Sequence, residues 1–387
     1  MENWSPQERL LIDHATELAS ILRGSLAANW CASGESARHY LKLAAERGLT
    51  GIEVPQAWGG SQASFSCKAA IAEILAGADF GFAMSLINTH NVANNIARWM
   101  SGPGTTVGQA ALADELLPKL LSAEIVACTA LTEPQAGSDF SAISTLATKV
   151  DSGWKIDGEK SWIINAQFAD LILVYAQTLP QSGAAGIAGI LVDARREGFE
   201  RCDNFPSTAA ASLGTGSFKL NGYVATPVEM MHPAGTAFKR ALQSINGARI
   251  YVAAMCCGMV ADCLRIATDY GGRRTTFGVP LNEHQGWRWR IAEAAVDLEA
   301  ATQLVRAACK AMDRDLPVVA LAAKAKVFAT RMAERHTAAM LHAMGAHGLR
   351  DEYPFVRHMT GAQIASFTDG STEMMLERIF KDETLVR

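Results

Sequence analysis

Two hydroxyl side chains stand among turn-forming residues in the segment Ala130–Asp139, and this combination is suited to holding a ligand. Pro134 and Gly137 let the backbone turn tightly. A tight turn brings peptide groups, together with the hydroxyls of Thr132 and Ser138, close to a flat ligand. Ten residues carry little weight alone, so the segment has to be judged with the rest of the chain.

Self-contained catalytic motifs are missing from the sequence. It has no Gly-x-Ser-x-Gly elbow, no His-Glu-x-x-His pair, no Walker loop and no Gly-x-Gly-x-x-Gly after a strand. Gly214-Thr215-Gly216 is too short for a dinucleotide fingerprint and is expected to form a β-turn. Residue patterns alone therefore indicate an α+β protein without pointing to one reaction.

Length and charge bound the class of protein. The 387 residues exceed the size at which one hydrophobic core stops growing, and 49% of them are hydrophobic, which predicts two or three subdomains. The formal net charge is −4 and no long basic run occurs. A nucleic-acid partner is therefore not expected, because the electrostatic footprint for one is missing.

Charged residues run through Met1–Ser20 and leave no apolar core for a signal peptide, and no later segment offers 18 uncharged apolar residues. A cytoplasmic protein without a membrane segment is expected. The eight cysteines include no Cys-x-x-Cys pair. Cys256, Cys257 and Cys263 lie in a helical apolar pattern, which favours reduced core thiols over a disulfide frame, and no metal site is expected.

The first 120 residues show helical patterns. Pro6 opens a helix whose apolar residues recur at helical spacing, and Gly24 is predicted to end it. Gly102-Pro103-Gly104 is predicted to break a later helix. An N-terminal helical domain over residues 1–122 follows.

From about residue 125 to 230 the pattern changes to short β-rich runs. Strands are predicted at Leu171–Gln177, Ile187–Val192 and Ser217–Leu220. Asp157-Gly158 and Asn221-Gly222 are typical of hairpin turns. The Gly- and Ala-rich segment 181–189 is predicted to be a loop. The simplest packing is a small β-barrel or a sandwich, and we assign a central β-barrel domain to residues 123–232.

Three long helices are predicted in the C-terminal part. They span about 236–270, closed by Gly271-Gly272, about 281–313, and about 317–345, opened by Pro317. The second has one apolar stripe that must pack on neighbouring helices, made of Ile291, Ala294, Leu298, Ala301, Val305, Ala308 and Met312. The predicted fold is thus α+β and mostly helical, with a C-terminal four-helix bundle over residues 233–387.

Five segments, taken in order, resemble the acyl-CoA dehydrogenase family. They are Gly48–Pro55 with Gly59-Gly60, Ala130–Asp139, Glu159–Ala166, Arg274–Gly278 with Gln285, and Asp369–Glu373. The resemblance spans nearly the whole chain and implies the same helix, barrel and bundle architecture. It also implies an FAD-dependent oxidoreductase, in which the flavin takes a hydride from the β-carbon of an acyl thioester while a carboxylate takes the α-proton.

By this resemblance, Asp369 stands where the family usually has its catalytic glutamate, directly before Gly370. Aspartate is one methylene shorter, which matters because a base must lie within hydrogen-bond reach of its proton. The alternative is that Asp369 only caps a turn or the next helix. A second family position for the base holds Ala248. The backbone N–H of Asp369 and a flavin ribityl hydroxyl are implied to bind the thioester oxygen.

The resemblance assigns cofactor-binding residues, each of which also has a plain structural alternative. Thr132, Ser138 and Trp162 match positions that line the flavin ring. Ile164 departs from the Thr or Ser of many relatives, whose hydroxyl lies close to flavin N5. Ser371, next to the base, is assigned to the same site.

Four further residues match positions that reach the FAD of a neighbouring subunit. Arg274, Phe277 and Gln285 match residues that hold its pyrophosphate and adenine, and Gly345 begins a Gly-Ala-His-Gly segment similar to a glycine turn near that cofactor. This arrangement requires a homodimer or homotetramer. The alternative for Arg274, with Arg273, is a solvated helix end.

Arg249, Gly370 and Thr368 are assigned to substrate binding by the same resemblance. Arg249 matches an arginine near the substrate entrance, although a lone arginine on a helix is as often a surface ion-pair partner. Thr368 replaces a tyrosine common in relatives, and further departures occur at Ile245, Asn246 and Thr360-Gly361. These departures predict a short or functionalised acyl group rather than a simple fatty acyl chain.

The group that carries the acyl thioester, here called the handle, is either CoA or the phosphopantetheine of a carrier protein, and the sequence leaves both possible. Few basic residues surround Ile245–Arg249, where the 3′-phosphate of CoA would need charge. Enzymes of antibiotic and polyketide pathways in the family use the carrier. The electron acceptor implied by the resemblance is an electron-transfer flavoprotein.

Two other functions remain open from the sequence. The first is a flavin oxidase similar to the nitroalkane oxidases, which use an aspartate base paired with a downstream arginine, for which Arg378 is the close candidate. The second is a flavin-binding scaffold without catalysis.

Overall fold

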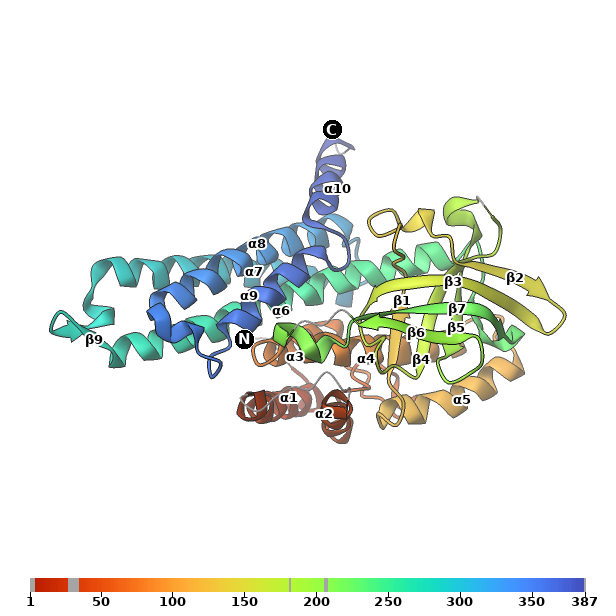
Figure 1. Ribbon diagram of the computed structural model, residues 1–387, viewed down its shortest axis with the longest axis horizontal. Coiled ribbons are helices and arrows are strands. Elements are labelled where there is room, and N and C mark those ends of the chain that lie inside the picture. The colour runs from red at the N-terminus through yellow and green to blue at the C-terminus, as the bar shows by residue number, and fades with distance from the viewer. Residues whose placement is uncertain (1–3, 27–34, 181, 205–207, 386–387) are drawn as a thin grey trace. The chain divides into compact units, whose positions relative to one another are not determined.

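The computed structural model describes all residues except 1–3, 27–34, 181, 205–207 and 386–387 (Figure 1). The chain forms two compact units. Unit 1 comprises Met1–Asn29, Ser64–Ala83 and Ile245–Arg387, and unit 2 comprises Trp30–Ala63 and Met84–Ser244. Helices α4 (Phe80–Met100) and α6 (Ala237–Arg273) each begin in one unit and continue into the other.

Unit 2 is built on one eight-stranded mixed sheet. Its main path runs β6-β7-β3-β2-β4-β5-β8, and β1 pairs with β4. The strands are β1 (Ala127–Ala130), β2 (Leu146–Val150), β3 (Gly153–Ile163), β4 (Leu171–Gln177), β5 (Ile187–Asp193), β6 (Phe199–Asn204), β7 (Gly216–Ala225) and β8 (Met230–His232). No pairing between described residues joins the ends of this path, so the closed barrel expected from the sequence is not confirmed.

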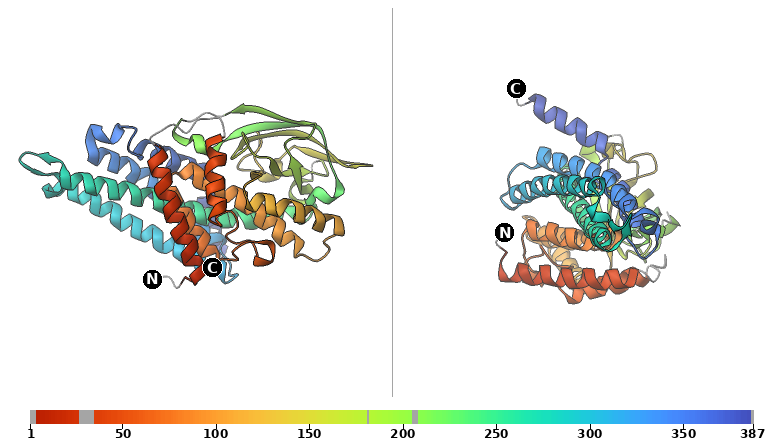
Figure 2. Two further views of the ribbon diagram at one scale, coloured as in Figure 1. Left: turned by 90° about the horizontal axis from the view of Figure 1, so that it is seen from below. Right: turned by 90° about the vertical axis from the view of Figure 1, so that its left-hand side faces the viewer.

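Strand β4 lies at the centre of unit 2 because both of its faces are apolar. Leu171, Leu173 and Tyr175 pack with side chains of α4 and of α5 (Val107–Leu121), whereas Ile172 and Val174 pack with residues of the other strands. This alternation follows from the two-residue period of a strand. Figures 1 and 2 show α5 running along the sheet. The predicted strands are confirmed, as is the helix break after Met100.

The two expected hairpin turns are wrong, because both Asx-Gly pairs lie inside long strands. The register of β3 and β7 shifts between the pairs Ile156↔Tyr223 and Gly158↔Leu220, and the backbone N–H of Gly222 donates to Asp157 Oδ1 (2.7 Å). The two pairs therefore face one another in a bulge, where glycine supplies the unusual dihedral angles. Gly214–Gly216 is likewise no separate turn, since Gly214 follows a 3-10 segment and Gly216 begins β7.

A buried ion pair fixes the segment that follows β1. Lys160 Nζ on β3 lies 2.8 Å from Glu133 Oε1, and both side chains are almost fully buried. The Glu133 carboxylate also accepts hydrogen bonds from the backbone N–H groups of Ser144 and Thr145 and from the side chains of Ser144 and Gln135. Lys160 Nζ donates in addition to the carbonyl of Leu131 (3.0 Å). Both ends of the segment 131–145 are thereby tied to one ion pair: the Leu131 end to Lys160 and the Thr145 end to Glu133.

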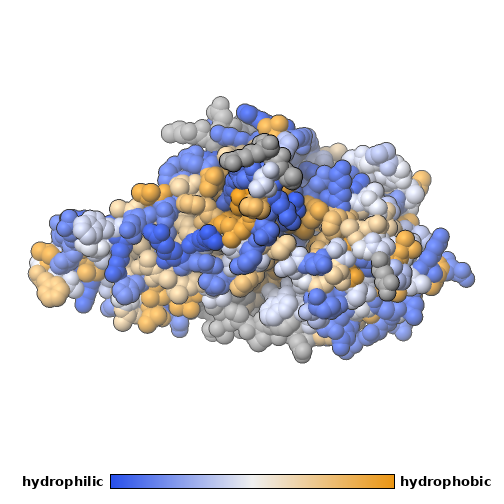
Figure 3. All heavy atoms as spheres, turned by 90° about the horizontal axis from the view of Figure 1, so that it is seen from above, coloured by the Kyte–Doolittle hydropathy of each residue, from blue (hydrophilic) through white to orange (hydrophobic). Residues whose placement is uncertain are grey.

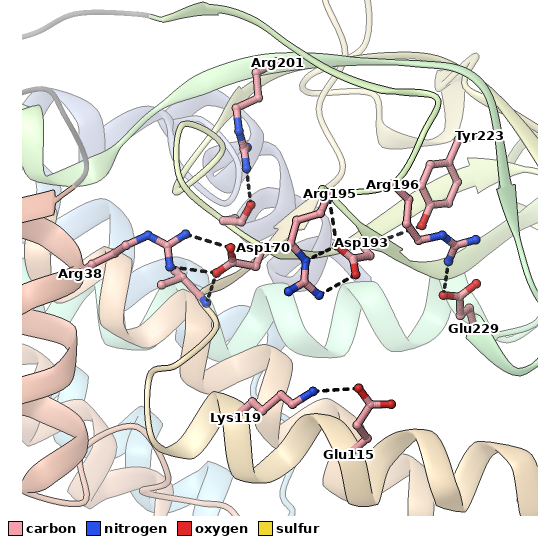
Figure 4. Close-up of polar contacts among 12 residues, drawn as sticks. Arg38, Glu115, Lys119, Asp170, Asp193, Arg195, Arg196, Arg201, Tyr223 and Glu229 are labelled. Carbon is pink, nitrogen blue, oxygen red and sulfur yellow. Dashed lines mark hydrogen bonds and ion pairs between the residues drawn. The ribbon is translucent and has the colours of Figure 1, made fainter.

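Arginine–carboxylate pairs join the outer parts of unit 2 (Figure 4). Arg38 on α2 (Glu35–Glu46) binds both carboxylate oxygens of Asp170 at 3.0 and 2.9 Å, and Asp170 also accepts the N–H of Val126. Arg196 binds Glu229 at 2.6 Å. Such bidentate geometry adds orientation as well as energy, so α2 is held against the beginning of β4.

Unit 1 is helical. It contains α1 (Pro6–Leu26), α3 (Phe65–Ala76), most of α6, α7 (Gln285–Asp313), α8 (Val319–Met344), α9 (Phe355–Phe367) and α10 (Thr372–Leu385). Residues of the predicted α7 stripe are buried or half-buried, as expected. Two glycine stops are wrong, because Gly24 lies inside α1 and Gly271-Gly272 lie in the last turns of α6. Interior glycine weakens a helix but does not end it when the helix packs on neighbours.

Helix α6 is the one described helix long and apolar enough to cross a membrane by length and composition, and 78% of that window is buried inside the protein. It packs backbone to backbone with α3. A Cβ on Gly258 would lie 2.0 Å from the carbonyl oxygen of Glu73, and one on Gly77 would lie 3.0 Å from that of Gly258. One turn later, Asp262 pairs with Arg23 of α1 (3.3 Å) and with Arg265 (3.0 Å).

The cysteines of α6 are buried free thiols, as the sequence predicts. Burial raises the pKa of Cys256 to about 12 and the pKa values of Cys257 and Cys263 well above the ordinary thiol value. They stay protonated and behave as small apolar groups. Among the described residues, no group of three or more His, Cys, Asp and Glu is arranged to hold a metal ion.

We expect Gly258→Ala to lower the free energy of unfolding by about 1–3 kcal/mol, because the methyl group overlaps a main-chain carbonyl that cannot move without shifting α3. Gly24→Ala is the control. Its Cβ meets nothing within 4 Å, so we expect a gain of about 0.5–1 kcal/mol from helix propensity. Urea denaturation midpoints of the FAD-loaded proteins measure both changes, and equal effects would show that the α3–α6 approach is not tight.

The Glu133–Lys160 pair predicts an acid-sensitive fold in unit 2. Burial opposes ionisation of Glu133, but Lys160 and the hydrogen bonds to Thr145 and Ser144 lower its pKa from 4.5 to about 2. The unfolded chain takes up this proton first as the pH falls, so the stabilisation is present above pH 4.5 and is lost toward pH 2.

We expect Glu133→Gln to destabilise the protein by about 3–5 kcal/mol at neutral pH, because it leaves the Lys160 ammonium buried without its counter-charge. The same change should flatten the loss of stability in acid. Glu159→Gln is the matched control, because Glu159 lies on β3 next to Lys160 and forms a partly exposed pair with Lys219. It should change the free energy of unfolding by less than about 1 kcal/mol. Denaturation curves between pH 3 and pH 7 test both expectations; an unchanged acid slope in Glu133→Gln would contradict them.

Candidate active site

A left-handed turn between α9 and α10 presents Asp369. Helix α9 is followed by Thr368, and α10 begins at Thr372. Between them, Asp369 has φ +57° and Gly370 has φ +101°. A non-glycine residue at such a φ is uncommon and is tolerated best by Asp and Asn. Backbone outliers of this kind concentrate at functional sites, which makes the turn a candidate site.

Two buried cations bind the two carbonyl oxygens of this turn. Arg249 Nε on α6 donates to the carbonyl of Asp369 (3.1 Å), and its Nη1 donates to Asn246 Oδ1 (2.8 Å). Lys326 Nζ on α8 donates to the carbonyl of Gly370. Arg249 is 8% exposed and Lys326 is 1% exposed. The turn is therefore held from two helices by charge-assisted hydrogen bonds.

The carboxylate and the backbone N–H of Asp369 are left free. Within the part of the chain that the structure describes, neither group makes a hydrogen bond to protein. Burial raises the pKa of Asp369 above the ordinary value of 3.8, and Lys326 and then Arg249 oppose that rise. A carboxyl with an elevated pKa and no protein partner can accept a proton from a bound ligand.

These contacts argue against the structural alternatives left open for Asp369 and Arg249, and they show what the Thr368 hydroxyl does. Asp369 does not act as a cap, because the N–H groups of Met374 and Met375 in α10 donate to Ser371, whose hydroxyl and carbonyl accept them. Arg249 is not a surface ion-pair partner, since it is buried. The hydroxyl of Thr368 donates back to Ile364 (2.8 Å) and so helps to end α9.

The residues expected at the flavin ring lie together in unit 2. The carbonyl of Thr132 accepts the N–H of Ser161, next to Trp162 (3.1 Å). Ser138 is exposed, Ile164 is half-buried, and Trp162 is 62% exposed with φ +59°. A large apolar ring held in a left-handed conformation at the surface is costly unless it serves a ligand. The Glu133 anchor supports the backbone on which Thr132 and Ser138 stand.

The residues expected to reach a neighbouring subunit lie at one end of unit 1. Arg274 precedes a hairpin of β9 (Thr275–Thr276) and β10 (Val279–Pro280), whose turn holds Phe277 and Gly278 at positive φ. Gln285 begins α7, and Gly345, with φ +62°, follows α8. Trp287 Nε1 donates to the carbonyl of Ala343 (3.1 Å), which ties the start of α7 to the end of α8.

Phe277 is 98% exposed at the tip of this hairpin, and Arg274, Gln285 and Gly345 are exposed as well. Other large hydrophobic side chains are also exposed on α7, among them Trp289 and Val296. Figure 3 shows hydrophobic residues as orange patches on one face of the molecule. A groove of about 500 Å³ between α7, α8 and α10 contains none of the expected site residues. An exposed phenylalanine beside an arginine is suited to a partner rather than to water.

Lys326 is the residue of this site that the sequence motifs did not indicate. It belongs to no motif, and Lys324 two positions earlier is an exposed lysine. The sequence feature that could have indicated it is its spacing. Lys326 lies four residues after Ala322 and four before Thr330, which puts it on the buried face of α8. A lysine in phase with a buried stripe predicts a buried ammonium that needs a partner.

Comparison with known families places each part of the chain. Residues 5–124 match the N-terminal domain of acyl-CoA dehydrogenase, residues 128–222 its middle domain and residues 235–383 its C-terminal domain. These three ranges leave little of the chain unmatched.

Individual relatives agree over most of their length. The short/branched chain specific acyl-CoA dehydrogenase of Rattus norvegicus is 32% identical over 87% of this chain and 76% of that protein. The short-chain specific acyl-CoA dehydrogenase of Megasphaera elsdenii is 31% identical over 85% of each chain. The solved structure of butyryl-CoA dehydrogenase from the same organism is 27% identical and covers all of both chains with a TM-score of 0.89. The protein belongs to the acyl-CoA dehydrogenase family and is an FAD-dependent flavoprotein oxidoreductase.

Proposed function

We propose that this enzyme oxidises the Cα–Cβ bond of a short or functionalised acyl thioester, with Asp369 as the base that takes the α-proton. The observation that carries the proposal is the free Asp369 carboxylate, which has a raised pKa and is presented by a turn whose two carbonyls are already bound. The relatives described above, which are short-chain and short/branched chain specific dehydrogenases, support the substrate class.

The chain's own groups have separate parts in this reaction. The Asp369 carboxylate accepts the proton from Cα and becomes a neutral acid, which burial favours. The free N–H of Asp369 is suited to donate to the thioester oxygen, where negative charge develops as the proton leaves. Arg249 and Gly370 keep the turn in the conformation that aims both groups. Bound FAD supplies the acceptor for the hydride that leaves Cβ.

The residues present fit FAD. Trp162 offers an exposed indole, its neighbour Ser161 is bonded to the backbone of Thr132, and Ser138 is exposed on the same segment as Thr132; Ile164 offers an apolar side chain. We assign Ser371 to the same site. Arg274, Phe277, Gln285 and Gly345 are exposed at one end of unit 1 and would hold the pyrophosphate and adenine of a second subunit's cofactor. The proposed assembly is therefore a homodimer or homotetramer.

CoA is the first choice of handle, because the named relatives act on CoA esters. Carrier-protein phosphopantetheine is the competing handle, favoured by the few basic residues around Ile245–Arg249 and by the burial of Arg249 itself. We propose an electron-transfer flavoprotein as the acceptor and the cytoplasm as the location.

We expect Asp369→Asn to slow anaerobic flavin reduction by about 10²–10⁴-fold, because loss of a positioned base has that effect. Wild type should lose flavin absorbance with one class of thioester when tested against matched acyl-CoA and acyl-carrier substrates. Asp369→Glu retains a carboxylate and is the control for loss of charge at this position. Bound FAD must be equal in all three proteins for the rates to be compared.

Other outcomes of this experiment point elsewhere. Unchanged bleaching in Asp369→Asn would remove Asp369 as the base. A parallel assay of the same substrates in air tests the oxidase: rapid peroxide formation would favour it, although Arg378 is exposed and Arg249 is the arginine bound to the turn. No bleaching with any thioester would leave a flavin-binding scaffold.

We expect Arg249→Met to reduce the rate of flavin reduction by about tenfold to a hundredfold. It removes a charge-assisted hydrogen bond of about 1.5–3 kcal/mol from the carbonyl of Asp369 and leaves that oxygen unpaired. Lys239→Met, an exposed cation on the same helix, is the control and should leave the rate unchanged. Equal rates in Arg249→Met and wild type would mean that the turn keeps its shape without this arginine.

A further inference from the structure

The carbonyl oxygens of Asp369 and Gly370 are bound by cations from two different helices, and the second cation belongs to no motif of the sequence. Lys326 lies on the buried face of α8 with Ala322, Thr330 and Ala333. The residue is 1% exposed, so its ammonium is deprived of water. The only hydrogen bond seen from its Nζ to a described residue goes to the carbonyl of Gly370.

A buried ammonium with a single carbonyl partner is costly unless an anion lies near it. Asp369 is the anion that favours the charged form of Lys326 most, and Lys326 in turn acts on Asp369 more strongly than Arg249 does. Burial lowers the pKa of Lys326 to about 8, so it is largely charged at neutral pH.

The other charged and titratable groups around the turn come from α6, α8 and α10. They are Arg249, Cys256, Glu373 and Arg378, and Arg331 on α8 in turn acts on Glu373. Cys256 is neutral because burial raises its pKa to about 12, and Glu373 is exposed. Asp369 therefore faces mainly positive charge, of which Lys326 is the largest part.

We propose that Lys326 is the positioning residue of the catalytic carboxylate: it holds the Asp369–Gly370 turn through the carbonyl of Gly370 and supplies the charge that keeps Asp369 ionised between turnovers. This inference rests on the proposed role of Asp369 as the base. A base with a raised pKa is useful only while it is deprotonated before substrate arrives. Lys326 sets the lower pH limit at which that condition holds.

The sign of the effect follows from the two charges. Removing the positive charge of Lys326 raises the pKa of Asp369 further, because burial then acts against a weaker opposing charge. The acid limb of kcat/KM against pH reports this group in the free enzyme. The limb should move to higher pH by about one unit in a neutral variant, which is the size of shift that one close charge produces.

Three substitutions separate the charge of Lys326 from its hydrogen bond. Lys326→Arg keeps both, Lys326→Gln keeps an N–H donor without charge, and Lys326→Met keeps neither. Lys324→Met is the matched control, since Lys324 lies on the same helix and pairs with Glu383 at the surface. Each FAD-loaded protein is assayed by anaerobic flavin reduction from pH 5 to pH 9.

We expect the acid limb to shift upward in Lys326→Gln and Lys326→Met, and to stay near that of wild type in Lys326→Arg and Lys324→Met. Lys326→Met should also lower the plateau rate, because the carbonyl of Gly370 loses its donor. A uniform loss of rate in all three Lys326 variants, without displacement of the limb, would show a packing role only and would overturn the proposal.

A second readout needs neither substrate nor turnover. The proton titration of each protein is compared with that of the same protein carrying Asp369→Asn, and the difference gives the pKa of Asp369 directly. We expect a higher value in the Lys326→Met background than in wild type, and an equal value would overturn the proposal. If no thioester reduces the flavin, the proposed function fails while this titration still decides the role of Lys326.

Discussion

The backbone-to-backbone approach of α3 and α6 is the constraint on which unit 1 depends. Where Gly258 lies against Glu73, no side chain sets the spacing, so main-chain atoms alone fix it. Arg249 stands about two and a half turns earlier on the same rigid helix. The position of the cation that binds the Asp369 carbonyl therefore derives from a contact between two backbones, and Asp262 with Arg23 extends this frame to α1.

Two carboxylates, one in each unit, differ in how the protein surrounds them. Glu133 accepts five hydrogen bonds, including one from the Lys160 ammonium, and its pKa is lowered to about 2. Asp369 accepts none from the described residues, and its pKa is raised. Many hydrogen-bond donors keep the Glu133 carboxylate permanently charged, whereas the lack of donors among the described residues leaves Asp369 able to exchange a proton.

The sequence predicted the elements whose signal is periodic and local. The α7 stripe and strands β4 and β5 have such signals, and the family resemblance covered the architecture. It did not predict the bulge at Asp157 and Gly222, because an Asx-Gly pair only says that unusual dihedral angles are needed, and both a hairpin and a bulge need them. Gly24 shows the same limit, since tertiary packing outweighs one unfavourable helix residue.

Some residues of the candidate site could be predicted from local sequence motifs, and others could not. Asp369 and Arg249 were found because their neighbours in sequence resemble family motifs, whereas Lys326 approaches Gly370 from 44 residues away and has no such neighbours. Long-range contacts of this kind depend on how α8 packs, which residue spacing does not encode. The open sheet path of unit 2 is a further case, because strand patterns do not specify whether the sheet closes.

The left-handed backbone of Asp369 gives a reason for the residue type at this position. The resemblance implies glutamate here, yet φ +57° favours Asp and Asn, whose short polar side chains tolerate that conformation better than longer ones. Aspartate therefore carries less backbone strain than glutamate would at this position, while its side chain is one methylene shorter. If Asp369 is the base, as we propose, its substrate has to bring the acidic carbon nearer to the backbone of this turn by the length of one methylene.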